Sequence, residues 1–333
     1  MHKKGVLLIN LGTPDHSDTK SVRVYLKEFL NDPRVIDLPR FARWVLTNLL
    51  IVPFRYKKSA AAYQQIWTEA GSPLLVNSQL IVTQLQVLLG HEYQVALAMR
   101  YRFPSVKQAL TSLKDCDSLH IIPLFPQYAT ASSGSAMANV LQELATSWNI
   151  PSIFMHKDFY VLPGFISATI ARCKEAIAAQ RIEHYVFSFH GLPERQIQKS
   201  GCQFECIHQD SCPTMNKANA YCYRAQCYAT ARAIAQGLGL DESHYSVCFQ
   251  SRLGSTPWIK PYTDEVLPAL LKKGIKNIAI ACPSFVADCL ETLEEINLRA
   301  RKTWDEQGGQ VFVFIPCVND HPEWVQSLAA MVK

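Results

Sequence analysis

The chain has 333 residues, of which 48% are hydrophobic and 18% are charged, so it carries enough apolar mass for a large core and is not a disordered protein. Its length predicts about two domains. The formal net charge is +5, from 33 basic and 28 acidic residues without a basic run, so nucleic acid is not expected as a partner.

Segments that direct a protein to a membrane or out of the cell are not expected. The N-terminus runs directly into a strand-like segment, without the long apolar stretch of a signal peptide, so we expect a cytoplasmic protein. The longest apolar stretch, residues 44–54, is far shorter than the roughly 20 residues that span a bilayer. In such a chain the 11 cysteines are expected to be free thiols or metal ligands.

Short apolar runs alternate with amphipathic stretches along the chain. The runs predict buried strands at residues 5–10, 93–99, 118–124, 184–190, 245–250, 277–282 and 311–315. The amphipathic stretches predict helices at residues 21–30, 75–89, 135–148, 164–179, 264–272 and 288–304. Strand followed by helix, repeated, predicts a doubly wound α/β fold in which helices flank parallel sheets.

Two pairs of short phrases recur in the same order, about 160–180 residues apart. GTPD at residues 12–15 and GLPE at residues 191–194 each close a predicted strand, and PLF at 123–125 and PSF at 283–285 each close another. They suggest two related halves with a boundary near residue 150. Both glycine turns are expected at the carboxyl ends of strands, where parallel sheets carry their chemistry. The dinucleotide and P-loop glycine motifs are missing, so no nucleotide is expected.

Groups that can handle a metal and protons lie at two predicted strand ends. His190 ends a buried strand directly before a glycine, which suits a metal ligand or a base, although a histidine that merely caps a strand would look the same. Asp288, Glu291 and Glu295 follow another strand and at helical spacing share one face. They could relay protons or bind a cation, or be solvated acids that complement the helix dipole.

Four cysteines form the densest group of soft metal ligands, and a fifth, Cys227, follows. They are Cys202, Cys206, Cys212 and Cys222. Four thiolates suit a 2Fe-2S cluster or a structural zinc, but the spacing matches neither the paired C-x2-C pattern nor the plant ferredoxin run. Reduced thiols packed in a loop are the third alternative.

Taken together, the strand-end phrases resemble the ferrochelatase family, whose members insert ferrous iron into a porphyrin to make haem. The resemblance covers nearly the whole chain. It rests on GVLLINLGTPD at residues 5–15, MRY at 99–101, PQY at 126–128 with residues 132–135, SFHG at 188–191, QSRLGSTPW at 250–258 and FVADCLETLEE at 285–295. Each phrase alone is weak evidence for the family, but six phrases in the family's order are highly specific evidence.

The resemblance implies two Rossmann-like domains of the chelatase kind with a porphyrin cleft between them. We expect the first domain at residues 1–150 and the second at 151–317, with a Cys-rich insertion at about 200–222. A C-terminal helix at about 318–333 is expected to pack back on the first domain. The implied reaction inserts Fe²⁺, a substrate, into protoporphyrin IX and releases two protons, which forms protohaem as the terminal step of haem biosynthesis.

The same resemblance implies roles for individual residues. His190 and Glu291 match the family's active-site pair and are expected to be catalytic and to contact the substrate Fe²⁺, with Glu295 and Asp288 as a proton relay. The residues expected to line or order the porphyrin pocket are Leu11, Arg100, Tyr101, Tyr128 and Trp258. Many relatives have a histidine two residues before the helix glutamate, whereas this chain has Cys289, so a relay there must do without imidazole.

Some ferrochelatases carry a 2Fe-2S cluster, usually on a carboxyl-terminal extension. In this chain the internal cysteines Cys202, Cys206, Cys212 and Cys222 could supply the ligands. Cys227 is omitted from this set, because relatives without a cluster can also have cysteine at its position.

The apolar segment 41–54 is interpreted as a lip that meets a membrane surface, with an ordinary amphipathic core helix as the alternative. Arg55, Lys57 and Lys58 follow it and suit anionic headgroups, and Arg55 suits the porphyrin propionates. The expected partners besides the substrates are the inner-membrane surface, which would make the cytoplasmic protein peripherally associated, and the preceding porphyrin-forming enzyme.

Three other functions stay open from the sequence alone. A redox or iron-sensing protein would depend on the cysteine cluster, and a passive tetrapyrrole-binding protein would hold haem without making it. A related chelatase could use cobalt or nickel, or act on coproporphyrin. The phrases GLPE and DCLETLEE most resemble those of protoporphyrin enzymes from Gram-negative bacteria.

Overall fold

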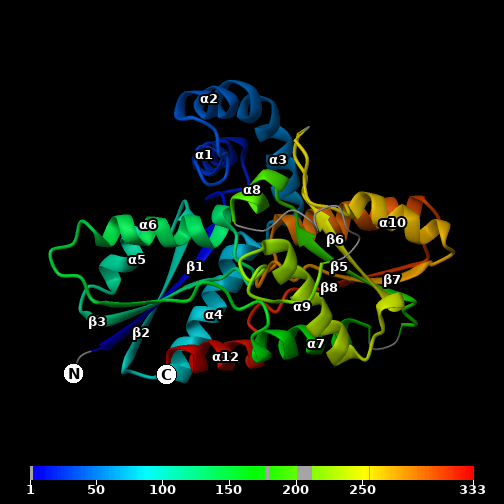
Figure 1. Ribbon diagram of the computed structural model, residues 1–333. Coiled ribbons are helices and arrows are strands. Elements are labelled where there is room, and N and C mark those ends of the chain that lie inside the picture. Colours follow the sequence, from blue (N-terminus) through cyan, green and yellow to red (C-terminus); the bar gives the residue numbers. More distant parts are fainter. Residues whose placement is uncertain (1–2, 178–179, 201–211, 255) are drawn as a thin grey trace. The chain divides into compact units, whose positions relative to one another are not determined.

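Two parallel sheets of four strands each form the framework of the computed structural model (Figure 1). The structure describes residues 3–177, 180–200, 212–254 and 256–333. The chain divides into two units, each of which contains one sheet. The first unit comprises the residues up to Phe125, Ala129–Asp158 and Leu328–Lys333, and the second comprises Pro126–Tyr128 and Phe159–Ser327.

The first sheet has the strand order β2-β1-β3-β4, and all neighbouring strands are parallel. Its strands are β1 (Lys3–Gly12), β2 (Tyr93–Tyr101), β3 (Cys116–Pro123) and β4 (Ser152–Met155). The helical segments of this unit are α1 (Thr19–Leu30), α2 (Arg40–Val45), η1 (Leu46–Ile51), α3 (Val52–Ile66), α4 (Pro73–Leu89), α5 (Val106–Ser112), η2 (Thr130–Gly134) and α6 (Ser135–Leu144).

The central strand β1 is buried on both of its faces. Residues 6–9 have no exposed surface, and because side chains alternate along a strand, Leu7 and Ile9 face one layer while their neighbours face the other. Leu7 and Ile9 pack with Val106 of α5 and Val140 of α6. Helix α4 contacts β1 and β2, and Figure 1 shows it on the opposite side of the sheet from α5 and α6.

The second sheet repeats this topology with the strand order β6-β5-β7-β8. Its strands are β5 (His184–His190), β6 (Tyr245–Gln250), β7 (Asn277–Ala281) and β8 (Val311–Ile315). Its helical segments are α7 (Pro163–Ile177), α8 (Glu194–Lys199), α9 (Tyr223–Leu238), η4 (Glu242–His244), α10 (Thr263–Lys272), η5 (Glu291–Ala300), α11 (Arg301–Glu306) and α12 (Pro322–Val332), whose last residues belong to the first unit.

A second apolar core lies against this sheet. Val186 and Ile280 pack with Leu267 of α10, Ile296 of η5 and Trp304 of α11. Helices α7 and α9 contact β8 and β6, and Figure 1 shows them on the side of the sheet opposite α10. Both faces of this parallel sheet are therefore covered, as its apolar strands require.

The predicted doubly wound α/β fold is confirmed, and the strands at 184–190, 245–250 and 311–315 occupy the predicted residues. Strand β4 was not predicted, because side chains at this sheet edge alternate between exposed and half-buried and form no continuous apolar run. Helix α9 was also not predicted. It buries polar side chains, including Arg224, Gln226 and Thr230, and these obscure the apolar period of a helix.

The stretch predicted as one helix at 288–304 differs in its start and in its winding. It consists mainly of the π-helix η5, which has 10 residues and begins at Glu291, and the α-helix α11 follows directly. A π-helix has i→i+5 hydrogen bonds and is usually a single turn, often at functional sites. Apolar periodicity alone does not distinguish it from an α-helix.

Candidate functional site

Strand β5 carries His190 to the carboxyl end of the second sheet, where it pairs with Gln250 at the end of β6. Gly191 follows directly. A Cβ atom on this residue would lie 2.8 Å from the Gln250 carbonyl oxygen and 3.1 Å from Cε3 of Trp258. Glycine at this position therefore allows the end of β5 to approach both β6 and the indole.

The backbone carbonyl of the next residue, Gly191, holds the His190 ring in one tautomer. Its Nδ1 lies 2.6 Å from the Gly191 carbonyl oxygen, and because a carbonyl only accepts, Nδ1 must carry the proton and donate. In the neutral ring Nε2 is then left with its lone pair, ready to bind a metal or take a proton. The imidazole has two aromatic neighbours, Phe285 and Trp258, at centroid distances of 6.2 and 6.5 Å.

Glu291 and Glu295 lie four residues apart on η5 and are both half-buried. The helix is tied to the end of β6 at both positions. The Gln250 side-chain amide donates to the Glu291 carbonyl oxygen at 2.8 Å. The Glu295 carboxylate accepts from the Ser251 N–H at 2.9 Å and from the Ser251 hydroxyl at 2.5 Å. The same contacts hold Ser251 at a φ of +66°, a left-handed conformation that is unusual for serine.

Asp288 does not share the helical face of the two glutamates, which corrects the spacing argument. It precedes η5 and is buried, and its carboxylate accepts from the Thr292 hydroxyl at 3.0 Å, the Cys317 N–H at 3.2 Å and the Asn319 amide at 2.8 Å. These bonds join the start of η5 to the segment after β8. The i, i+3, i+7 argument fails because the helix begins after Asp288.

Cys289 lies beside Glu291 and is buried. Burial, and then the neighbouring Glu291 charge, raise the pKa of this thiol well above its ordinary value. The thiol therefore stays protonated near neutral pH and does not exchange protons as an imidazole would.

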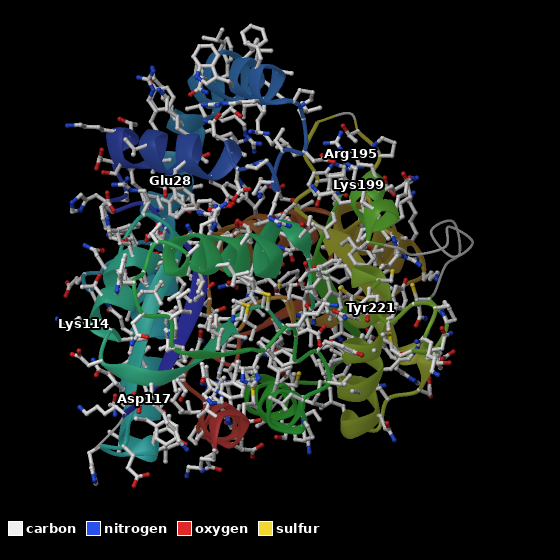
Figure 2. All side chains as sticks on the ribbon, turned by 60° about the vertical axis from the view of Figure 1, so that its left-hand side comes forward. Glu28, Lys114, Asp117, Arg195, Lys199 and Tyr221 are labelled. Carbon is white, nitrogen blue, oxygen red and sulfur yellow. The ribbon has the colours of Figure 1, made fainter. Side chains whose placement is uncertain are left out.

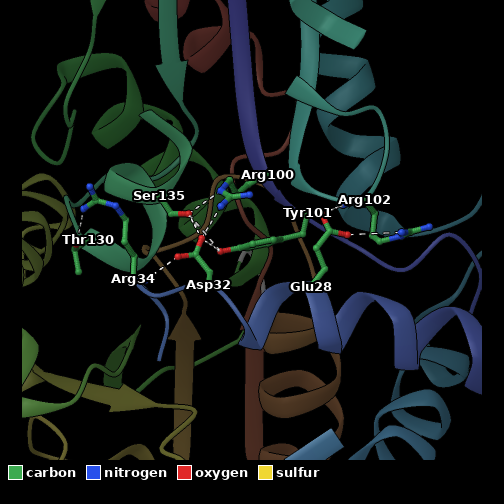
Figure 3. A network of polar contacts seen from close by, with 8 residues as sticks. All are labelled: Glu28, Asp32, Arg34, Arg100, Tyr101, Arg102, Thr130 and Ser135. Atoms are coloured by element: carbon green, nitrogen blue, oxygen red, sulfur yellow. Dashed lines mark hydrogen bonds and ion pairs between the residues drawn. The ribbon is translucent and has the colours of Figure 1, made fainter. Parts of the chain in front are cut away.

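A network of polar side chains surrounds Asp32 in the first unit (Figure 3). The buried carboxylate accepts from Arg100 Nη2 at 2.6 Å, from the Tyr101 hydroxyl at 2.9 Å and from the Ser135 hydroxyl at 2.5 Å. It also accepts from the Arg34 N–H at 2.7 Å. Arg100 donates in addition to Ser135 at 2.7 Å, so the network fixes the guanidinium from two sides.

The network holds Asp32 in its charged form. Burial alone would raise the pKa of Asp32, but the hydrogen bonds from Ser135 and the Arg34 N–H and the charge of Arg100 outweigh it, so the pKa lies below its ordinary value. For Tyr101, burial and then the Asp32 charge raise the pKa, so its hydroxyl stays a donor. Tyr101 is only 1% exposed. That burial suits a residue that orders a pocket rather than one that lines it.

The other residues predicted for the pocket differ in their surroundings. Leu11 is half-buried and Arg55 is exposed on α3. The Tyr128 N–H donates to the Gln226 side chain at 2.8 Å, and the Trp258 indole donates to the Leu253 carbonyl at 3.0 Å. Asp32 was not found from the sequence, because its partners are up to 103 residues away along the chain.

Two of the four predicted cluster cysteines, Cys202 and Cys206, lie outside the described residues. Cys212 and Cys222 are both buried, and the Arg224 guanidinium donates to Cys212 Sγ at 3.0 Å. Arg224 itself is only 1% exposed. Within 3–177, 180–200, 212–254 and 256–333, no group of three or more Cys, His, Asp or Glu side chains could hold a metal ion.

The segment α2–η1–α3 presents large apolar side chains to solvent. Phe41 and Phe54 are 79% exposed, and Trp44, Leu49 and Leu50 are just over half exposed. This is not the burial of an ordinary core helix, the alternative considered from the sequence. None of the helices in the described part of the chain has the length and apolar content needed to cross a bilayer.

Comparisons with known proteins agree on one family. The family model described as Ferrochelatase matches residues 3–333. The chain is 53% identical over 331 residues to the ferrochelatase of Legionella pneumophila strain Lens, with 99% of each chain covered. It is 45% identical over 335 residues to that of Coxiella burnetii strain CbuK_Q154, covering 100% of this chain and 94% of the relative.

Among solved structures, the sirohydrochlorin chelatase SirB from Bacillus subtilis subspecies spizizenii, in complex with cobalt, is similar with a TM-score of 0.54 at 10% identity. The match covers 99% of this chain and 94% of that one. SirB from Bacillus subtilis with Fe³⁺ gives a TM-score of 0.53 at 11% identity, covering 98% and 93%. At such identities the likeness concerns the fold alone.

Asp32→Asn is expected to lower the free energy of unfolding by about 1–3 kcal/mol at pH 7, because buried donors lose a charged acceptor. Since the folded pKa of Asp32 is lowered, the carboxylate stabilises fully above its unfolded pKa of about 3.9 and loses this effect as the pH falls through the folded pKa. Urea unfolding at pH 7 and at about pH 3 measures the difference, which should shrink at the lower pH.

The control is Asp15→Asn, which breaks the more exposed ion pair with Arg102 and should cost less than about 1 kcal/mol. Equal losses for the two variants, or a loss for Asp32→Asn that does not change with pH, would contradict the role given to the network.

Proposed function

The chain belongs to the ferrochelatase family, and we propose that His190 and Glu291 are the catalytic pair of its reaction. The reaction is the insertion of Fe²⁺ into protoporphyrin IX, which yields haem and two protons. The chain is therefore a metal chelatase of haem biosynthesis. The observation that best supports the proposal is the His190 ring, whose Nδ1–H is committed to the Gly191 carbonyl so that Nε2 keeps its lone pair.

Two tasks are divided among these residues in the proposal. The Nε2 atom of His190 takes a pyrrole proton or hands over the metal. Glu291, the first residue of η5, accepts a proton, and Glu295 continues the path one turn further along the same helix. The hydrogen bonds from Ser251 hold the Glu295 carboxylate in place, which fixes that end of the relay. Asp288 is not needed for this path, because its carboxylate is occupied by three other partners.

For porphyrin binding, the proposal gives different roles to the six predicted residues. Arg100 and Tyr101 are ordered by Asp32, and Arg100 keeps a side chain that is 20% exposed. A fixed guanidinium suits a propionate carboxylate, since arginine binds carboxylates through several donors at once. Contacts to the ring are assigned to Leu11, Tyr128 and Trp258, and Arg55 is assigned to a propionate.

Removal of either catalytic group is expected to abolish or cripple turnover without unfolding the protein. His190→Ala should be inactive, and Glu291→Gln should lose roughly 10²-fold in kcat, the range expected when acid–base assistance is lost. Anaerobic absorbance time courses with Fe²⁺ and protoporphyrin measure both. The control is Glu294→Gln, on the same helix but paired with Arg299. Near-normal kcat in folded His190→Ala, or a Glu291→Gln change confined to KM, would contradict the assignment.

The exposed apolar side chains of α2–η1–α3 are proposed to dock the protein on an anionic membrane surface. Leu49, Leu50 and Phe54 project apolar surface. Arg55, Lys57 and Lys58 follow in sequence on α3 and supply positive charge. An apolar surface with basic neighbours is the combination that interfacial helices use.

Replacing Leu49 and Leu50 together with serine should weaken binding to anionic vesicles by at least roughly tenfold, since each buried leucine contributes about 1.5–3 kcal/mol. Vesicle co-sedimentation measures this effect. The melting temperature should hardly change, because both side chains are exposed. Replacing Val87 and Leu88 of α4, also exposed, is the matched control and should leave binding intact. A collapse in melting temperature with unchanged vesicle binding would show that the segment is core.

The cysteine segment is proposed to hold a 2Fe-2S cluster through Cys202, Cys206, Cys212 and Cys222. The support comes from Cys212, whose sulfur accepts a hydrogen bond from the buried Arg224 guanidinium. A buried cation favours the thiolate form, and hydrogen bonds to sulfur are a usual means of tuning such clusters. Cys227 is not a ligand in this proposal, and burial raises the pKa of its thiol well above the ordinary value.

Anaerobically purified protein should be red-brown with visible charge-transfer bands. Cys212→Ser and Cys222→Ser should each bleach the protein, because each removes one of the four proposed ligands. Cys227→Ser should not, because Cys227 is not a ligand. Absorbance spectra and iron analysis make the measurement. Colourless protein with one equivalent of zinc would replace the cluster with a structural zinc, and colourless metal-free protein with full activity would make these cysteines ordinary thiols.

A further inference from the structure

The backbone of His190 lies where one side of strand β5 has lost its partner strand. The β5–β6 ladder continues to His190 and Gln250, whereas the β5–β7 ladder ends at Phe187 and Ala281. Pro283 lies two residues after the end of β7, and proline has no N–H with which to continue a ladder. The polar backbone groups of β5 that point toward β7 near His190 must therefore find other partners.

Two hydroxyl groups take the place of the missing strand. The His190 N–H donates to Ser284 Oγ at 3.0 Å, and the Tyr223 hydroxyl donates to the His190 carbonyl at 2.8 Å. Tyr223 and Ser284 lie 3.2 Å apart, oxygen to oxygen. Because the single Tyr223 proton goes to the carbonyl, Ser284 must donate to Tyr223. The three hydrogen bonds form a closed ring that includes both backbone polar groups of His190.

Both hydroxyls are suited to a fixed ring of hydrogen bonds between neutral groups. Tyr223 is 6% exposed and Ser284 is 8% exposed, so water does not compete freely for these bonds. Hydrogen bonds in such a ring polarise one another and strengthen the whole.

We propose that Tyr223 and Ser284 are positioning residues for the reaction, which hold the His190–Gly191 backbone so that the imidazole presents Nε2. The link is short, because the carbonyl that fixes the Nδ1 proton belongs to Gly191, the next residue. This inference rests on the proposed catalytic role of His190. Neither hydroxyl is assigned a contact with a substrate.

One member of this hydrogen-bond ring, Tyr223, lies next to Cys222 in the chain. Tyr223 is the first residue of α9, and Cys222 is its N-cap.

The test compares Tyr223→Phe and Ser284→Ala with three controls. Tyr228→Phe removes a hydroxyl from a buried tyrosine on the same helix, Tyr221→Phe removes one from a tyrosine that is 63% exposed (labelled in Figure 2), and Ser284→Thr keeps the hydroxyl. Steady-state chelation gives kcat and KM. NMR of ¹⁵N-histidine-labelled protein, with the His190 signals identified by their loss in His190→Ala, reports which ring nitrogen carries the proton.

Tyr223→Phe and Ser284→Ala should each lower kcat by roughly tenfold with less than about a twofold change in KM for porphyrin. A misplaced catalytic group slows the chemical step and leaves substrate binding nearly unchanged. The His190 signals of both variants should show mixed tautomers. The double variant should lose little more than either single one, because both break the same ring. Ser284→Thr should keep the wild-type kcat and the single His190 tautomer. Tyr228→Phe and Tyr221→Phe should also leave kcat and the tautomer unchanged.

Two outcomes would overturn the inference while leaving His190 as the catalytic residue. The first is wild-type kcat and an unchanged His190 tautomer in Tyr223→Phe, alongside inactive His190→Ala. The second is an equal loss of kcat in Tyr228→Phe, which would reduce the ring to a general contribution to stability. Full activity in His190→Ala would instead remove the proposed function, and the inference with it.

Discussion

The end of strand β7 is the constraint on which the end of β5, with His190, depends. Had the β5–β7 ladder continued past Ala281, the backbone of His190 would be fixed by a neighbouring strand, as in the interior of the sheet. The ladder ends at Ala281, and side chains take over the hydrogen bonds of the His190 backbone. The end of the ladder also lets the chain after β7 turn into η5 beside the end of β6. The end of β7 thus separates the part of β5 that is held by strands on both sides from the part that is held on one side by side chains.

The π-helix adds a second departure from regular structure at the same edge. Two sets of hydrogen bonds anchor its N-terminal half. Asp288 joins the segment before η5 to the chain that follows β8, and Gln250 and Ser251 join its first turns to β6. A wide helix is rarely stable on its hydrogen bonds alone, so such side-chain anchors account for its length. The carboxylates of Asp288 and Glu295 therefore hold the helix in place, whereas the Glu291 side chain lies beside the Cys289 thiol.

The sequence allowed the framework to be predicted because its strands are continuous apolar runs bounded by glycine and proline. It also pointed to His190, since a histidine at the end of such a run is conspicuous. Asp32, Tyr223 and Ser284 could not be found in this way. Their roles come from partners up to about 100 residues distant along the chain, and no local pattern encodes those contacts. Asp288 was misjudged for a related reason, because spacing assumes a helix whose first residue is already known.

The two halves of the chain show how one backbone solution can carry different chemistry. A Cβ on Gly12 would clash with the Tyr101 carbonyl at the end of β2, and a Cβ on Gly191 would crowd the Gln250 carbonyl at the end of β6. These are equivalent places in the shared strand order, so the repeated glycine is explained by the close approach of equivalent strand ends. The residue before each glycine is Leu11 in the first half and His190 in the second. The repeat thus fixes where a side chain is presented, whereas the residue at that place decides whether the side chain is an apolar group or an imidazole.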